Sequence, residues 1–151
     1  MNIALLAFTA AGARTGEIIR DRLEAAGHRC RGSVKGSFSH HTALHKEEAP
    51  LRQWAEQAFS EEDALIFIGA TGIAVRAIAP FIDSKCSDPA VLVIEEQGRH
   101  VISLLSGHIG GANQLALDIS GWINGEPVIT TATDLNGYFS VDRWAVEQNL
   151  T

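Results

Sequence analysis

The hydrophobic positions of this chain alternate between short apolar runs and stretches with helical spacing. Apolar runs of strand length occur at Asn2–Phe8, Ala64–Ile68 and Ala90–Glu95. Such runs are typical of strands that are buried on both faces of a parallel sheet. Two other segments, Ala49–Phe59 and Gln114–Ile123, repeat their apolar side chains as one face of a helix does. The pattern therefore predicts strands that alternate with helices.

Weaker signals complete the order of elements. After a turn at residues 9–12, a helix is expected that ends at Gly27, and His28–Val34 follows as a strand. A helix up to Pro80, a strand Val128–Thr131 and a last helix from Tyr138 are also expected. The inward face of the first helix is expected to hold Ile18, Ile19, Leu23 and Ala26.

The order of elements predicts the fold class. The short segment Glu96–Arg99 joins the preceding strand to Val101–Leu105, and so short a link is most simply a hairpin. The other strands alternate with helices, which is typical of parallel strands joined by right-handed crossovers. We therefore expect one α/β domain over residues 1–151, three-layered and doubly wound like flavodoxin or Rossmann domains. Its sheet would be mostly parallel, with one antiparallel hairpin.

Composition narrows the classes of partner. Of the 151 residues, 46% are hydrophobic and 20% charged, and the net charge is −6. An acidic chain lacks the basic footprint that general binding to nucleic acid or to anionic membrane requires. The first apolar run is too short to span a membrane and has no basic leader. Cys30 and Cys86 have no metal-site spacing, which indicates free thiols in a reducing cytoplasm.

Three turns are candidate binding elements, because ligands of open α/β sheets bind outside the carboxyl ends of the strands. In the first turn, Gly69 and Gly72 permit close approach of the backbone to a ligand. Thr71 could cap the next helix, and Arg76 could bind a carboxylate with two hydrogen bonds. The alternative is an ordinary capped helix with a surface arginine.

The second turn has three glycines in five positions, which suggests positive φ angles or close approach to a ligand. Within it, His108 could act as a general acid or base. A tight turn with a capping or exposed histidine is the alternative. The turn matches neither phosphate-binding glycine motif, which disfavours a nucleotide site. The candidate binding residues are Ser106, Gly107, Gly110, Gly111 and Asn113.

The third turn follows the last predicted strand and gathers hydroxyl, carboxylate and amide groups. Asn136 with Gly137 would by itself be a turn, and Asp134 by itself a helix cap. Together at the end of a strand, these groups are more typical of one wall of a polar site. The candidate residues are Thr130, Thr131, Thr133, Asp134 and Asn136.

A polar loop, residues 36–48, carries a histidine cluster without helical or strand periodicity. His40, His41 and His45 are spaced H-H-x-x-x-H, but no carboxylate or cysteine spacing completes a known metal site. A solvated loop is therefore the favoured interpretation over a metal site. The loop could also be a lid over the site, or be disordered.

Three segments together resemble one family. They are FIGATGIAVRAIAPFI, SDPAVLVIEEQGRHVISLLSGHIGGANQLA and PVITTATDLNGYFSVDRWA. They are similar, in this order from Asp63 to Ala145, to the N-terminal region of the cobalamin-biosynthesis family CbiG, the cobalt-precorrin 5A hydrolases. Members of that family are usually longer, so the resemblance implies an N-terminal domain whose C-terminal domain is absent from this chain. That domain is an expected partner.

The resemblance implies an activity. Members of this family open the δ-lactone on ring A of cobalt-precorrin 5A, an anionic tetrapyrrole, and release acetaldehyde to give cobalt-precorrin 5B. Such a step needs a base, a positioned water and donors for the oxyanion. We expect His108 as base or proton shuttle, backbone N–H groups near Gly110 and Gly111 as donors, and Asp134 as an assisting group. Arg76 and helix N-termini suit the substrate carboxylates.

Two further expectations concern cofactors and alternatives. Cobalt belongs to the substrate, so neither a cofactor nor a protein metal site is expected. The chain could instead be a non-catalytic corrinoid-binding module that acts with the missing C-terminal domain. A flavodoxin-like nucleotide binder is the third interpretation.

Overall fold

The computed structural model describes residues 1–37 and 41–131, and within them the predicted alternation of strands and helices is present. The last helix, expected from Tyr138, lies outside the described residues. The elements are β1 (Asn2–Ala7), α1 (Ala10–Ala25), β2 (Arg29–Val34), β3 (His45–Lys46), α2 (Leu51–Glu61), β4 (Ala64–Ile68), α3 (Thr71–Ile78), the 3₁₀ turn η2 (Ala79–Phe81), β5 (Ala90–Ile94), β6 (His100–Leu105), α4 (Ala112–Ile123) and β7 (Glu126–Val128).

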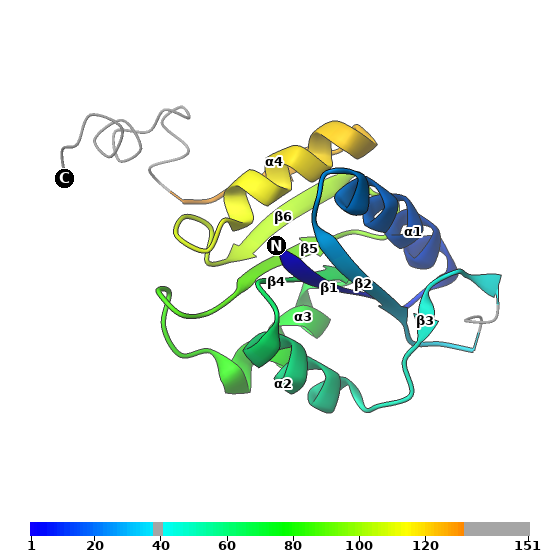
Figure 1. The fold of residues 1–151 in the computed structure, drawn as a ribbon, viewed down its shortest axis with the longest axis horizontal. Coiled ribbons are helices and arrows are strands. Elements are labelled where there is room, and N and C mark those ends of the chain that lie inside the picture. Colours follow the sequence, from blue (N-terminus) through cyan, green and yellow to red (C-terminus); the bar gives the residue numbers. More distant parts are fainter. Residues whose placement is uncertain (38–40, 132–151) are drawn as a thin grey trace.

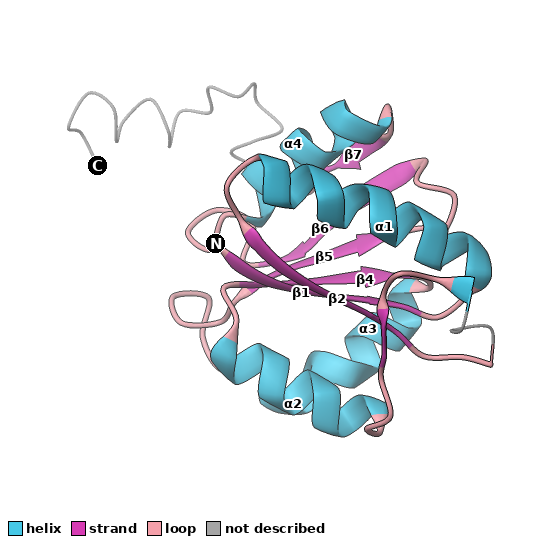
Figure 2. Ribbon diagram, turned by 45° about the vertical axis from the view of Figure 1, so that its right-hand side comes forward, coloured by secondary structure: helices cyan, strands magenta, loops and turns pink. Residues whose placement is uncertain are grey.

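The strands form one seven-stranded sheet in the order β3-β2-β1-β4-β5-β6-β7. Pairing is parallel from β3 to β5, antiparallel between β5 and β6, and parallel again between β6 and β7. Helices α1 and α4 cover one face, and α2 and α3 cover the other (Figures 1 and 2). The three-layered α/β class, the mixed sheet and the hairpin are therefore confirmed.

The core explains why the central strands appear in the sequence as unbroken apolar runs. Side chains of β1 alternate between the two faces, so that Ile3 and Leu5 pack under α1 and α4 while Ala4 and Leu6 face α2 and α3. Every side chain of β4 and β5 is buried. Helices on both faces remove the polar positions that a half-exposed strand would show.

The first helix starts earlier than expected. It begins at Ala10, because the Thr9 side chain accepts a hydrogen bond from the Gly12 N–H at 2.9 Å and so caps the helix. The predicted turn at residues 9–12 is therefore wrong. Gly27, with φ 95°, follows the end of the helix as predicted, because a left-handed conformation there suits glycine.

The inward face of α1 is narrower than predicted. Ile19 and Leu23 are fully buried, whereas Ile18 is 55% exposed and Ala26 is exposed. Ile18 lies about 100° around the helix from Ile19, which turns it away from the sheet. The placement of Ile18 and Ala26 on the inward face is therefore wrong.

A short strand was missed in the polar loop. His45 and Lys46 pair with Ser33 and Val34 at the end of β2. Leu44, which is 4% exposed, anchors this segment. Two residues are too few to show a period of two in the sequence.

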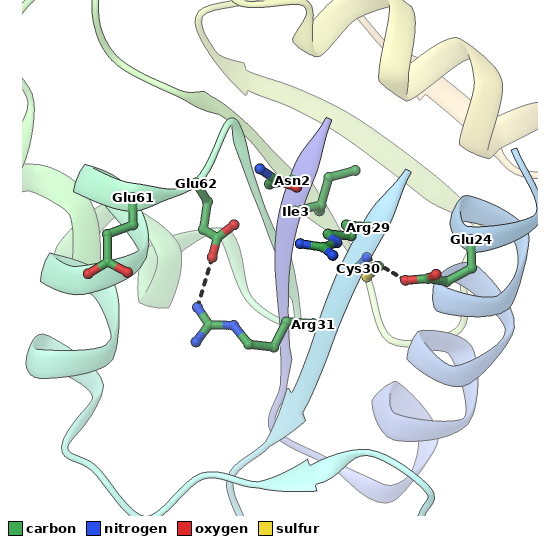
Figure 3. Close-up of a pocket in the computed structure, with 8 residues that line it drawn as sticks. All are labelled: Asn2, Ile3, Glu24, Arg29, Cys30, Arg31, Glu61 and Glu62. Atoms are coloured by element: carbon green, nitrogen blue, oxygen red, sulfur yellow. Dashed lines mark hydrogen bonds and ion pairs between the residues drawn. The ribbon is translucent and has the colours of Figure 1, made fainter. Parts of the chain in front are cut away.

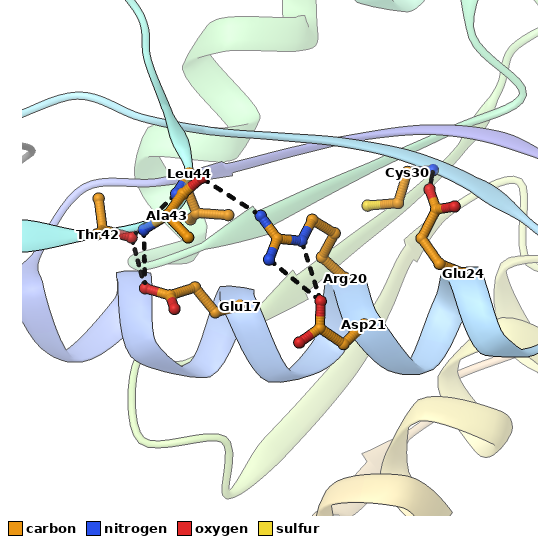
Figure 4. Close-up of polar contacts among 8 residues, drawn as sticks. All are labelled: Glu17, Arg20, Asp21, Glu24, Cys30, Thr42, Ala43 and Leu44. Carbon is orange, nitrogen blue, oxygen red and sulfur yellow. Dashed lines mark hydrogen bonds and ion pairs between the residues drawn. The ribbon is translucent and has the colours of Figure 1, made fainter.

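The segment before β3 is tied to α1 by polar contacts (Figure 4). The carboxylate of Glu17 accepts a hydrogen bond from the Thr42 hydroxyl at 2.6 Å. The guanidinium of Arg20 donates to the Ala43 carbonyl at 3.4 Å. β7 also differs from expectation, since it begins at Glu126 and ends at Val128.

Replacing Thr9 by alanine is expected to lower the free energy of unfolding by about 1–2 kcal/mol, because the cap of α1 is lost. Thr9→Ser keeps the hydroxyl and should stay within about 0.5 kcal/mol of the parent chain. Urea unfolding followed by circular dichroism measures both. Equal stability of Thr9→Ala and the parent would show that the cap contributes nothing.

Candidate functional site

The antiparallel strand β6 separates the three predicted turns. The carboxyl ends of β1, β4 and β5 share one edge of the sheet, and the turn at Gly69 lies there. Val101 pairs with Ile94 and Leu105 with Val91, so β6 ends at the opposite, amino edge. β7 runs parallel to β6 and ends there too. The expectation that all three turns lie at one edge of the sheet is therefore wrong.

The first turn lies at the carboxyl edge and is bonded to the neighbouring strand. The Gly69 N–H donates to the Ile94 carbonyl at 2.9 Å, which ties the turn to β5. Thr71 is the first residue of α3, and the position before it makes no side-chain cap, so the predicted capping role of Thr71 is wrong. A Cβ on Gly72 would lie 3.3 Å from Arg76 Nη1, so the guanidinium folds back over that glycine. Thr71, Gly72 and Arg76 are exposed.

A protein carboxylate occupies the place where doubly wound domains bind anions. From the neighbouring strands β1 and β4 the chain continues in opposite directions across the sheet, to β2 on one side and to β5 on the other. This is the switch point of the sheet, and α1 begins there. There the Thr9 hydroxyl donates to Glu96 Oε2 at 2.6 Å, and the Thr15 hydroxyl donates to the Glu96 carbonyl at 2.7 Å. Glu96 thus supplies the negative charge that is favourable beside a helix N-terminus. This disfavours the nucleotide-binding interpretation.

The turn that holds Glu96 is itself ordered by a carboxylate. Glu95 accepts hydrogen bonds from the backbone N–H groups of Gln97 and Arg99. Partial burial acts to raise the pKa of Glu95, but these two N–H groups, together with the charges of Arg99 and His100, outweigh it and hold the pKa below its usual range. The hairpin predicted at Glu96–Arg99 is thus built on local hydrogen bonds as well as on strand pairing.

At the amino edge, the second turn joins β6 to α4 through left-handed backbone. Ser106 has φ 57°, and Gly111, the N-cap of α4, has φ 89°. The Ala112 N–H donates to the Ser106 carbonyl at 3.2 Å, and the Asn113 N–H donates to the Gly107 carbonyl at 2.9 Å. The first turn of α4 is therefore bonded to the turn that precedes it.

Two glycines of this turn are required by packing. A Cβ on Gly107 would lie 2.6 Å from Asn113 Oδ1 and 3.1 Å from Thr131 Oγ1. A Cβ on Gly110 would lie 2.5 Å from the Cβ of Ser106 and 2.8 Å from its carbonyl oxygen. At Gly107 and Gly110 the close approach expected of a ligand is therefore made by other atoms of the protein. At Gly111 the backbone needs glycine for another reason, which is its positive φ.

The turn presents two side chains outward. His108 is exposed, and Ile109 is 66% exposed. They stand beside the N-terminus of α4, where the helix dipole favours developing negative charge. The donors expected for an oxyanion are the N–H groups near Gly110 and Gly111, because those of Ala112 and Asn113 already bond to the turn. An imidazole beside such donors can move a proton while the donors hold an oxyanion.

Asn113 was predicted to bind substrate, and the structure shows what it contacts within the protein. Its side chain is 7% exposed. Asn113 Oδ1 accepts a hydrogen bond from the Ser103 hydroxyl at 2.6 Å, and Nδ2 donates to Thr131 Oγ1 at 3.3 Å. Ser103 was missed, although a lone serine in the apolar strand HVISLL was a signal.

The second and third turns meet at this contact. Thr131 lies beside Gly107, and Thr130 precedes it as an exposed residue. Ser106 is anchored in turn by its hydroxyl, which donates to the Asp88 carbonyl at 3.1 Å. Thr133, Asp134 and Asn136 lie outside the described residues.

The histidine loop gives no metal site in the described part of the chain. Among residues 1–37 and 41–131, no group of three His, Cys, Asp or Glu side chains could hold a metal ion. His41 and His45 belong to this part, and His40 does not. None of the helices in the same ranges has the length and apolar character that crossing a membrane requires.

A pocket of about 500 Å³ opens at the amino ends of β1 and β2 (Figure 3). Arg31 pairs with Glu62 at 3.1 Å, and Glu24 accepts a hydrogen bond from the Cys30 N–H at 2.6 Å. Three carboxylates against two guanidinium groups make it a poor site for an anion. The lining residues are Asn2, Ile3, Glu24, Arg29, Cys30, Arg31, Glu61 and Glu62.

Both cysteines are free, as predicted. Cys86 is exposed, while Cys30 is partly buried in the wall of this pocket. Burial, followed by the carboxylate of Glu24, raises the pKa of Cys30 to about 12. Cys30 is therefore a protonated thiol at neutral pH and a weak nucleophile.

Fold and site together define a mixed, doubly wound α/β domain with a histidine-bearing glycine turn at a helix N-terminus. The family model described as cobalamin synthesis G N-terminal matches residues 53–134, more than half of the chain. The chain belongs to this family, and the resemblance seen in the sequence is confirmed.

Individual relatives agree with this assignment. A cobalt-precorrin-5A hydrolase of Salmonella typhimurium is 59% identical over 95 residues, which are 63% of this chain and 27% of that protein. One of Priestia megaterium is 45% identical over 61% of this chain and 25% of that protein. A crystal structure from Sulfolobus solfataricus, described as a cobalamin biosynthesis protein G homolog, superposes with a TM-score of 0.68 and 25% identity. That match covers 95% of this chain and 39% of the other.

The difference in length is large. The chain spans about a quarter of the length of the curated relatives that it matches.

Adding one methyl group to the glycine turn should be costly. Gly107→Ala and Gly110→Ala are each expected to lower the free energy of unfolding by about 1–3 kcal/mol, because the new Cβ overlaps packed atoms. Gly121→Ala is the matched control, since its Cβ would meet nothing within 4 Å and alanine favours the helix. Urea titration compares the three. A control as destabilised as the turn variants would contradict this steric account.

The two thiols should differ in reactivity. At pH 8 a disulfide reagent is expected to modify Cys86 at least tenfold faster than Cys30, because burial and Glu24 keep Cys30 protonated. Mass spectrometry of peptides from a time course measures both rates, with the unfolded chain as reference. Equal rates in the folded chain would show that Cys30 is accessible as thiolate.

Proposed function

We propose that this chain carries the lactone-opening site of a cobalt-precorrin 5A hydrolase in cobalamin biosynthesis. Its substrate would be an anionic cobalt tetrapyrrole, with the cobalt brought by the substrate, and its products cobalt-precorrin 5B and acetaldehyde. The observation that carries the proposal is the packed glycine turn, which holds His108 outward beside the N-terminus of α4. Two relatives named cobalt-precorrin-5A hydrolase supply the reaction. We place it in the cytoplasm.

The geometry suggests how the reaction would proceed. Water attacks the lactone carbonyl while the imidazole of His108 takes its proton, and N–H groups near Gly110 and Gly111 hold the oxyanion. The carbon–oxygen bond of the lactone then breaks, and the leaving oxygen receives a proton from the imidazolium. The freed alcohol loses its proton, the carbon–carbon bond to the macrocycle breaks, and acetaldehyde leaves with its electron pair left on the ring. Asp134 would assist His108.

Other predicted residues take supporting roles. Ser106, Gly107, Asn113, Thr130 and Thr131 would shape the site at the amino edge. Arg76 and Gly69 lie at the other edge of the sheet, which five-residue strands put roughly 17 Å away. A contact of Arg76 with a peripheral carboxylate of the substrate stays a prediction, separate from the chemistry at His108.

The second candidate is a corrinoid-binding module without chemistry of its own. The match covers only about a quarter of each curated relative, which favours this alternative, because the remainder of those proteins would then supply catalytic groups. The expected partner is the C-terminal domain, in the same chain or as a separate one.

Acetaldehyde release from cobalt-precorrin 5A tests the proposal. The purified chain is assayed alone and mixed with the remaining part of the Salmonella typhimurium relative, produced as a separate chain. Release by this chain alone places the whole reaction on it, and release only from the mixture makes it one half of the site. Binding of the corrinoid without release in either case supports the module, and no binding contradicts both.

The role of His108 is tested by substitution. His108→Ala is expected to lower kcat about 100-fold or more, because the proton acceptor is lost. His100→Ala is the matched control, since His100 is exposed at the opposite edge of the sheet and should leave kcat unchanged. An undiminished kcat in His108→Ala would show that His108 is not the general base.

A further inference from the structure

A chain of hydrogen bonds, from Ser103 through Asn113 to Thr131, lies against the glycine turn. The Ser103 hydroxyl donates to Asn113 Oδ1 at 2.6 Å, and Asn113 Nδ2 donates to Thr131 Oγ1 at 3.3 Å. Ser103 is 8% exposed and Asn113 is 7% exposed. Because buried polar groups cost stability unless they are paired, two neighbouring ones indicate a specific structural demand at this place.

The Asn113 residue joins three segments that are separate in the sequence. Through Ser103 it contacts β6, through its backbone N–H it holds the Gly107 carbonyl at 2.9 Å, and through Thr131 it contacts the segment after β7. The absence of space for a Cβ on Gly107 follows from this arrangement, since Asn113 and Thr131 supply the nearest atoms. The turn is thus built against the Asn113 amide.

The strand that carries Ser103 is irregular at the same place. Leu92 pairs with Ser103 and Val91 pairs with Leu105, so Leu104 is an extra residue in β6. A bulge of this kind bends the end of a strand and changes its direction, and bulges are frequent beside functional sites. Ser103 is the last paired residue before the bulge, so its contact with Asn113 fixes the point from which the strand turns toward His108.

We propose that Ser103 and Thr131 are positioning residues that act through the Asn113 amide to set the place of the His108 turn. The inference rests on the proposed function, because it concerns the base assigned there. Neither residue needs to touch substrate for this role. Loss of either hydroxyl removes one of the hydrogen bonds that hold the Asn113 amide, and the turn then samples other conformations around His108.

Two pairs of variants remove and keep the hydroxyls in the full 151-residue chain. Thr131→Val removes one hydroxyl with little change of shape, and Thr131→Ser restores it, at a partly exposed position where folding is not at risk. Ser103→Ala removes the other. Ser60→Ala is the control, since the Ser60 hydroxyl is exposed on α2 and donates to the carbonyl of Gln57 within the same helix.

The first readout does not depend on turnover. Amide hydrogen exchange at Asn113 and Ala112, followed by nuclear magnetic resonance, is expected to accelerate at least tenfold in Thr131→Val and Ser103→Ala. The ring resonances of His108 should shift in both. Thr131→Ser and Ser60→Ala should match the parent chain. Unchanged exchange and unchanged His108 resonances in Thr131→Val would overturn the inference, whatever the activity of the protein.

The second readout separates positioning from stability. With cobalt-precorrin 5A as substrate, Thr131→Val is expected to lower kcat about tenfold with KM within twofold, and Thr131→Ser to recover kcat. Accelerated exchange with unchanged kcat would overturn the positioning role and leave a structural brace. If the parent chain shows no turnover, alone or with the remainder of the relative, the proposed function is refuted. Hydrogen exchange and the ring resonances of His108 still test whether Ser103 and Thr131 set the conformation of the turn.

Discussion

The antiparallel pairing of β6 with β5 is the interaction on which the arrangement of this domain depends. In a fully parallel sheet, every turn that follows a strand and precedes a helix lies at one edge. Here the hairpin reverses the chain after β5, so that the strand, the glycine turn and α4 all run the opposite way. The pairing therefore moves the start of a helix, with its N–H groups, to the edge where the parallel strands begin.

At that edge the polypeptide compensates for leaving regular structure. The carbonyls of Ser106 and Gly107 accept hydrogen bonds from the first N–H groups of α4, and the Ser106 hydroxyl donates to the Asp88 carbonyl. The buried Asn113 amide fills the space that a side chain at Gly107 would need. The turn is consequently a packed unit, although it is rich in glycine. A rigid unit can hold an exposed imidazole in one place, which is what proton transfer in a site requires.

The sequence predicted most of the fold and only part of the site. Unbroken apolar runs identified β4 and β5, and the short link after β5 identified the hairpin, because burial and chain length leave few alternatives. The same hairpin puts the turns at Gly69 and His108 at opposite edges of the sheet, because the rule that places every such turn at one edge holds only for parallel strands. The roles of Ser103 and Glu96 could not be predicted, because their partners are ten and 87 positions away and only the folded chain brings them together.

A single side chain, Glu96, occupies the start of α1 at the carboxyl edge of the sheet. The carboxylate beside the start of α1 belongs to a side chain, so the usual ligand edge of the fold is blocked by one residue's chemistry and not by the path of the backbone. A substitution at this one position would take the negative charge away from the start of α1 without touching a side chain of the two buried clusters that flank the sheet.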